Sequence, residues 1–122
     1  MIKILIIGLG GFAGSIARYL VYHGLDRHVQ TYFPYGTFLV NIAGSLLLGI
    51  IYGLMQRGNI LSEEMRLFLA IGFCGSFTTF STFAYENMIL LKGSNITGAL
   101  VYTIASVVVG IIFVYLGFVF SK

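Results

Sequence analysis

Four long apolar stretches separated by short polar segments dominate the pattern of residues along the chain. Charged residues are absent from 4–17, 29–56, 67–85 and 93–121. A membrane-spanning helix needs about 20 mostly apolar residues. Because the apolar pattern continues past single charges in the first and third stretches, we expect helices over about 2–22, 36–56, 63–91 and 96–120. The pattern therefore predicts an all-α integral membrane protein whose residues 1–122 form a single four-helix transmembrane domain.

The segments between these stretches carry residues that typically begin or end helices. Pro34 precedes the second predicted helix, and proline is poorly tolerated inside a helix because it lacks an N–H group. Ser62 is a predicted N-cap of the third helix, with Glu63 and Glu64 in its electropositive first turn. The polar segment 92–95 separates the third helix from the fourth.

Composition supports the membrane prediction and excludes several classes of protein. Hydrophobic residues make up 58% of the chain and charged residues 9%, against about 25% charged residues in ordinary soluble domains. A soluble domain of this size cannot cover so much apolar surface with polar groups. A soluble enzyme, a nucleic-acid-binding module and a disordered tail are therefore poor interpretations. The single cysteine, Cys74, excludes a disulfide within one chain.

A glycine-rich segment near the N-terminus resembles a dinucleotide-binding pattern. An apolar run leads into G-x-G-x-x-A over residues 8–13, but no alternation of strands and amphipathic helices follows it. Small residues four apart, such as Gly10 and Gly14, also let two membrane helices approach closely. We favour this packing interpretation.

The charges that flank the predicted helices are nearly balanced between the two sides of the membrane. Four basic residues lie on the side of both termini and three on or toward the other side: Lys3, Arg57, Arg66 and Lys122 against Arg18, Arg27 and Lys92. This difference gives almost no orientation signal. Either the topology is single and weakly specified, or the chain inserts both ways and forms an antiparallel dimer. We expect an oligomer in both cases, because four short helices enclose little interior.

The second predicted helix carries a stripe of small and polar residues spaced four apart. Its members are Thr37, Asn41, Ser45, Gly49 and Gly53. For the glycines and Ser45 we prefer a role in helix packing. A primary amide in hydrocarbon needs hydrogen-bond partners, so Asn41 should face other protein groups or a water-filled path. Hydrogen bonding between helices and contact with a ligand both remain open for Asn41.

The third predicted helix contains a hydroxyl-rich segment that favours either a break or a helix with back-bonded side chains. Five of the seven residues 76–82 are Ser or Thr, and Gly72 and Gly75 precede them. A break at this depth would expose carbonyls to a cation and N–H groups to an anion. Phe80 and Phe83 recur at a spacing of three, and a phenyl ring has a positive edge that can meet an anion.

Ionisable residues give no catalytic constellation. Arg18 lies within the first helix, where it either reaches the membrane surface or makes an aqueous vestibule electropositive. We find no Ser-His-Asp set, carboxylate pair or phosphate-binding loop, and we therefore expect a protein that is not an enzyme.

Three motifs carry a family resemblance that covers nearly the whole chain. They are GGFAGSIARY at 10–19, PYGTFLVNIAGSLLLG at 34–49 and GFCGSFTTFSTF at 72–83. In these motifs the chain closely resembles the small fluoride channels of the CrcB/Fluc family. The resemblance implies an antiparallel, dual-topology homodimer in the cell membrane, with a break in the third helix. Two pores of such a dimer would let fluoride leave the cell passively and so lower its toxicity.

The resemblance also implies roles for particular residues. Asn41, Phe80 and Phe83 would line the fluoride pores, and polar pore-side positions would be Ser81, Thr82, Tyr102 and Ser106. A structural sodium ion on the dimer axis would be held by the backbone carbonyls of Gly75 and Thr78. The polar series on the fourth helix lacks hydroxyls at Gly110 and Val114, which leaves the far end of the path unassigned.

Two other functions remain as alternatives. A small multidrug or guanidinium exporter also has four helices, but it uses a carboxylate in its first helix to exchange protons for a cation. The present chain has no Asp or Glu before Asp26. A non-transporting membrane subunit would explain the glycine positions, but it would not explain the chemistry of Asn41 and the third helix.

Overall fold

The computed structural model describes residues 1–28 and 33–122, and these residues form helices and connecting segments without a strand. The first two spans are α1 (Ile2–His28) and α2 (Tyr35–Gln56). The third consists of α3 (Glu63–Arg66), the π-helical η1 (Leu67–Cys74), α4 (Gly75–Phe77) and α5 (Phe80–Lys92), and the fourth is α6 (Ile96–Ser121). All four are long and apolar enough to cross a membrane, which confirms the predicted all-α architecture.

The helix limits lie close to the expected ones, with one exception. The second, third and fourth spans begin and end within a residue or so of the expected limits. The first helix was expected to end near residue 22, whereas α1 continues to His28. Polar residues accumulate after Tyr22, but none of them is a proline, and a helix can continue through such residues at a membrane surface.

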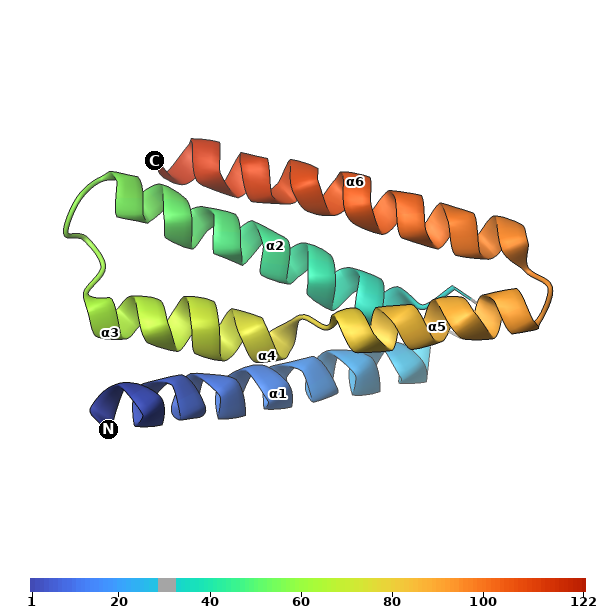
Figure 1. Cartoon of the computed structure of the whole chain (residues 1–122), viewed down its shortest axis with the longest axis horizontal. Helices are drawn as coiled ribbons and strands as arrows, with labels where there is room; N and C mark the ends of the chain where they lie inside the picture. The colour runs from blue at the N-terminus through green and yellow to red at the C-terminus, as the bar shows by residue number, and fades with distance from the viewer. Residues whose placement is uncertain (29–32) are drawn as a thin grey trace.

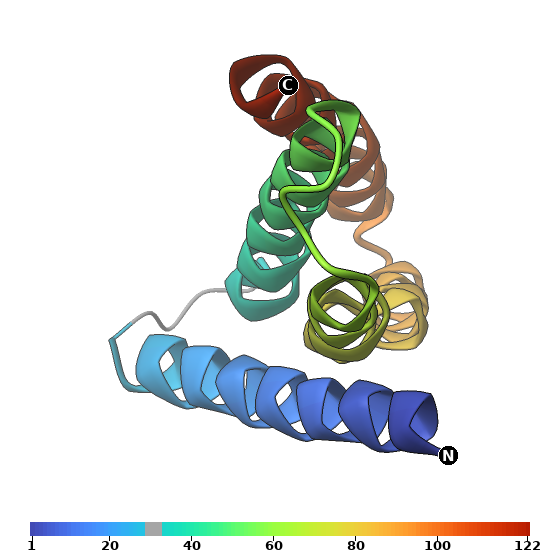
Figure 2. The ribbon, with the colours of Figure 1, turned by 90° about the vertical axis from the view of Figure 1, so that its left-hand side faces the viewer.

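The spans pair two by two. In Figure 1, α2 and α6 lie side by side, and α1 packs along η1 and α4. Figure 2 shows α1 crossing beneath the third span, on the side opposite α2 and α6. Both chain termini lie at the same end of the bundle in Figure 1, as four membrane crossings require.

Glycines let α2 and α6 pack with their backbones close together. A Cβ atom on Gly49 would meet the carbonyl of Val114, and one on Gly117 would meet the carbonyl of Leu46. Because both contacts involve main-chain atoms, neither glycine can gain a side chain without moving a helix apart from its neighbour. This agrees with the packing interpretation of the glycines in the second helix.

A second glycine contact joins α1 to the π-helical segment η1. Cβ atoms on Gly10 and Gly14 would meet the carbonyls of Phe68 and Phe73, and one on Gly72 would meet the backbone at Ile7 and Gly10. Glycines four apart in α1 therefore face carbonyls five apart in η1. The mismatch follows from the i→i+5 hydrogen bonding of a π-helix, whose turns are wider than those of an α-helix.

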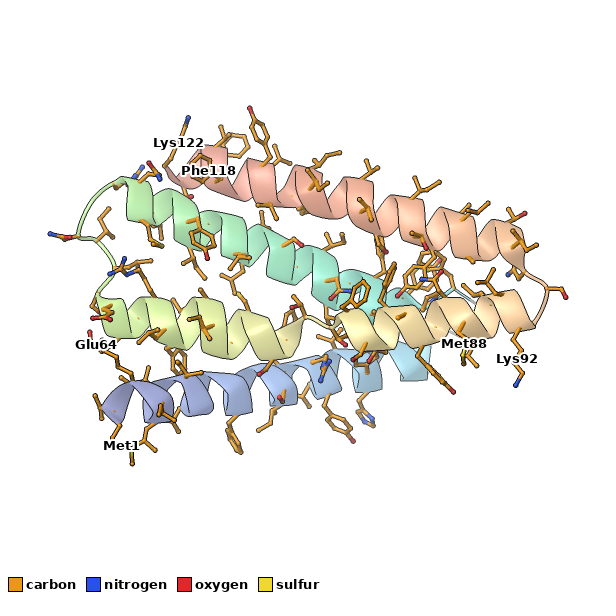
Figure 3. The ribbon with its side chains drawn as sticks, in the orientation of Figure 1. Met1, Glu64, Met88, Lys92, Phe118 and Lys122 are labelled. Carbon is orange, nitrogen blue, oxygen red and sulfur yellow. The ribbon has the colours of Figure 1, made fainter. Side chains whose placement is uncertain are left out.

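Charged groups lie at both ends of the bundle, and long apolar side chains are exposed along its length. Figure 3 shows Met1, Glu64 and Lys122 at one end and Lys92 at the other. At the first end, Lys3 Nζ lies 2.7 Å from Glu63 Oε1, which links the start of α1 to the start of the third span. Long apolar residues on the outer helix faces are exposed, which suits a protein surrounded by lipid.

Candidate functional site

A cavity of about 420 Å³ lies where α2, the middle of the third span and α6 meet. Six of the predicted site residues line this cavity: Asn41, Gly75, Thr78, Phe80, Phe83 and Ser106. Further polar lining comes from Ser45 and Thr79. The cavity therefore combines an amide, hydroxyls and aromatic rings contributed by three different spans.

The side chain of Asn41 holds an extended segment of the third span. Between α4 and α5, Thr78 and Thr79 have extended backbone, with ψ angles of 160° and 123°. Thr79 N–H donates to Asn41 Oδ1 at 2.8 Å, and Asn41 Nδ2 donates to the Thr79 carbonyl at 3.1 Å. One amide side chain thus satisfies both main-chain groups of Thr79, which would otherwise be costly to leave unpaired in the membrane.

The same hydrogen bonds leave two carbonyls without the partner that a continuous α-helix would supply. The amide of Thr79, which would bond Gly75 in such a helix, is taken by Asn41. The amide of Thr82, which would bond Thr78, instead donates to Thr79 Oγ1 at 3.2 Å. The carbonyls of Gly75 and Thr78 are therefore among those that lose their helical partner where α4 ends and α5 begins.

Glycine at position 44 lets α2 approach this extended segment. A Cβ atom on Gly44 would meet the methyl group of Thr78 and lie 3.5 Å from the ring of Phe77. Thr78 also bonds back to Cys74, its amide at 3.1 Å and its hydroxyl at 2.9 Å. The end of α4 is thus held both by the hydrogen bonds from Thr78 to Cys74 and by contact with α2.

Two aromatic rings line the cavity after the extended segment. Phe80 is 78% exposed on the chain, and its ring centroid lies 5.8 Å from that of Phe83. Phe83 in turn lies 5.0 Å from Tyr102 of α6, with the two rings inclined by 56°. The tilted geometry presents ring edges as well as faces, and the edges carry partial positive charge.

Ser106 contributes a hydroxyl that has no hydrogen-bond partner among the described residues, although its oxygen is buried. A buried hydroxyl without a partner is costly, which marks it as a group that a ligand or water would satisfy. Ser45, on the facing helix α2, donates to the carbonyl of Asn41 at 2.7 Å.

The remaining predicted residues lie outside the cavity lining. Ser81 is exposed and its hydroxyl lies 3.4 Å from that of Thr79, while Thr82 is half-buried. Arg18 is half-buried on α1. Tyr102 is fully buried, and its hydroxyl donates to Glu86 at 3.0 Å. The structure therefore places Tyr102 beside the cavity through its ring contact with Phe83, without making it part of the wall.

Sequence reasoning did not connect a set of buried polar contacts toward the Lys92 end of the bundle. Thr37 is fully buried, and its hydroxyl lies 2.6 Å from the Tyr22 hydroxyl. Thr103 donates to the side-chain carbonyl of Asn87 at 3.1 Å, which joins α5 to α6. The spacing-four stripe of α2 did include Thr37, but nothing in the sequence indicated its partner on α1.

Four apolar spans, three of which line a polar cavity with aromatic rings, define a multi-pass membrane protein. Residues 5–118 match the family model for CrcB-like protein, Camphor Resistance (CrcB). The chain belongs to this CrcB-like family.

Curated relatives extend over the full length of the chain. A protein of Phocaeicola vulgatus is 47% identical over 122 residues, which is 100% of both chains. One of Flavobacterium psychrophilum is 42% identical over 100% of this chain and 98% of the relative. One of Prosthecochloris aestuarii is 45% identical over 98% of this chain and 92% of the relative. Each of the three is named a fluoride-specific ion channel, FluC.

Proposed function

We propose that this chain forms a fluoride-specific ion channel that lets fluoride leave the cell passively. The observation that carries the proposal is the cavity in which Asn41 fixes an extended segment beside Phe80, Phe83 and the unpartnered Ser106 hydroxyl. The names of the curated relatives, which match the chain from end to end, support the same activity.

The chemistry of the cavity suits a small, strongly hydrated anion. Conduction requires that the protein replace water around the ion without binding it too tightly to leave. Hydroxyl and amide donors and the positive edges of phenyl rings can take this role without a full positive charge at the narrow point. Ser81, Thr82 and Tyr102 would extend the polar lining on either side of the cavity, and Arg18 would make a vestibule electropositive.

We further propose that two chains associate as an antiparallel homodimer with two pores. The nearly balanced flanking charges support insertion in both orientations. The outward-facing apolar residues of the chain give surface for a second copy as well as for lipid. A closed pair is the commonest form of homo-oligomer.

In such a dimer, the extended segment between α4 and α5 would form the break in the third span, and this break would hold a structural sodium ion. The carbonyls of Gly75 and Thr78 would be its ligands, because the capping by Asn41 and Thr79 releases them from helical hydrogen bonds. Space is open around Gly75, where an added Cβ would meet nothing within 4 Å. Carbonyl oxygens suit a hard cation, and the ion would add positive potential near the anion path.

One experiment separates the proposed function from its alternatives. Purified protein is reconstituted into liposomes loaded with fluoride, and efflux is followed with a fluoride electrode, with protein-free liposomes as the control. Passive efflux that stops unless charge is balanced by a potassium ionophore is the expected result. Proton-coupled cation exchange would identify an exporter instead, and the absence of both transport activities would indicate a non-transporting subunit.

A further inference from the structure

The polar series on α6 stops one turn after Ser106, at a glycine. Gly110 follows Ser106 at a spacing of four, so both positions lie on the same face of α6. Ser106 brings an unpartnered, buried hydroxyl to the cavity, whereas Gly110 has no side chain to continue the series. Any ion passing from Ser106 along this face therefore needs a donor from another helix.

The residue that faces Gly110 is a serine of α2. A Cβ atom built on Gly110 would lie 3.7 Å from Ser45 Oγ and 3.9 Å from Ile42, both ordinary contact distances. Ser45 also lines the cavity that Asn41 and Ser106 share. Its hydroxyl thus lies beside the place that a hydroxyl on residue 110 would occupy.

The hydroxyl of Ser45 can exchange its present hydrogen-bond acceptor for another one at little cost. Its single proton is donated to the Asn41 carbonyl at 2.7 Å. That carbonyl lies inside α2, where the amide four residues later is its regular helical partner, so it stays satisfied if the hydroxyl turns away. A hydrogen bond to an anion is roughly twice as strong as one between neutral groups, which favours the exchange when an anion is near.

We infer that Ser45 is a fluoride-binding residue that supplies, from α2, the hydroxyl donor missing at Gly110 on α6. The ion would pass from the Ser106 hydroxyl to that of Ser45 across the interface of the two helices. This inference rests on the proposed function. It adds Ser45 as a fluoride ligand, whereas the residue spacing alone indicates only a role in helix packing.

Moving the hydroxyl from one helix to the other tests the inference. Ser45→Ala should lower fluoride efflux from liposomes about tenfold, which corresponds to about 1.4 kcal/mol. Ser45→Ala combined with Gly110→Ser should restore most of the efflux, because the contact distances at Gly110 leave room for a side chain. Ser45→Ala combined with Gly110→Ala adds the same carbon without the hydroxyl and should stay low.

The controls keep the outcome clear. Ser121→Ala removes another back-bonded hydroxyl of the α2–α6 interface, one that donates to Gly117 and Ile50 away from the cavity, and should leave efflux unchanged. Fluoride efflux is compared only among variants that elute from a sizing column at the wild-type volume, so that a change in efflux does not reflect misfolding. If Ser45→Ala aggregates, Ser45→Cys, whose thiol is a weak donor, takes its place with the same expected fall.

Two results would overturn the inference: wild-type efflux in the Ser45 variant, or equal recovery with Gly110→Ala and Gly110→Ser. Failure of the proposed function is distinct, because the wild-type protein itself would then show no efflux in the same liposomes.

Discussion

The side chain of Asn41 forms a two-point hydrogen-bonded contact with the backbone of Thr79, a residue 38 positions away in the chain. Through this contact α2 takes over the amide that would otherwise continue the helix from Gly75. The shape of the third span at mid-membrane is therefore set by a neighbouring helix as much as by its own sequence. This relationship makes Asn41 both a structural residue and a member of the cavity wall.

Replacing Asn41 by Asp is expected to block fluoride flux. A carboxylate can accept from the Thr79 amide but cannot donate to the Thr79 carbonyl, and it brings negative charge into a cavity proposed for an anion. The unsatisfied Thr79 carbonyl costs about 1–3 kcal/mol of stability. Because the negative charge repels an anion, we expect efflux to fall roughly tenfold or more. Electrode-recorded efflux at neutral pH measures it, with Asn59→Asp in the exposed segment after α2 as the control. Normal flux through the Asn41 variant would show that this residue is only structural.

Phe80→Ile and Phe83→Ile should each reduce fluoride efflux while the protein keeps its elution volume. Isoleucine roughly preserves apolar bulk but removes the ring that lines the cavity, and with it the positive ring edge. A matched control is Phe120→Ile near the end of α6, because Phe120 is 82% exposed and Phe80 78% exposed on the chain. We expect a fall of roughly tenfold or more at the cavity positions and none at Phe120. Unchanged efflux in both cavity variants would remove the rings from the mechanism.

Gly14→Ala should destabilise the protein, whereas Gly8→Ala should not. A Cβ atom on Gly14 meets the carbonyl of Phe73 in η1, and one on Gly8 meets nothing within 4 Å. Forcing α1 away from η1 should cost about 1–3 kcal/mol, as overpacking commonly does. The midpoint of thermal unfolding in detergent, followed by the loss of the intact elution peak, measures the difference. Equal midpoints for the two variants would contradict the close packing of α1 on η1.

A tag attached at Lys122 should be found on both sides of the membrane. Four basic residues flank the spans on one side and three on the other, which leaves orientation almost unspecified. Accessibility of the tag to a membrane-impermeant reagent in intact and opened cells measures the two populations. Adding basic residues to the segment at 57–62 should shift the ratio, and a tag that always faces one side would exclude dual topology.

Exhaustive removal of sodium should weaken the dimer and lower fluoride efflux together. Without a cation, the carbonyls released at Gly75 and Thr78 would lack a partner, at a cost of several kcal/mol for each in a membrane. The measurement is dimer stability and efflux in a buffer that contains a bulky organic cation instead, with sodium added back as the control. Equal stability and efflux in both buffers would argue against the sodium site, and sodium itself should not flow with fluoride.

The four spans were predictable because membrane insertion depends on a property that sequence states directly, the absence of charge over about 20 residues. The predicted N-cap at Ser62 is confirmed for the same kind of local reason, since its hydroxyl accepts from Met65 N–H at 3.1 Å. The end of α1 was less predictable, because no residue between Tyr22 and His28 forces a helix to stop.

Relationships between spans could not be predicted in the same way. Asn41 was recognised as needing a partner, but its bond to Thr79 depends on how α2 and the third span pack. The π-helical turns of η1 have no compositional signal in Leu67–Cys74, so the spacing of the η1 carbonyls that face Gly10 and Gly14 could not be predicted either. The spacing of Ser45 matches that of the glycines and therefore indicates packing, whereas the further role that we infer for it depends on the facing Gly110.

The wide turns of η1 also mean that the number of residues in the third span matters independently of their identity. Each residue of an α-helix turns the chain by about 100°. Deleting one residue from Leu67–Cys74 would favour ordinary α-helical turns and rotate Gly75 and Thr78 relative to α1, with their side chains unchanged. The direction in which the carbonyls of Gly75 and Thr78 face therefore depends on the number of residues in η1. A comparison of residue types alone would overlook this dependence.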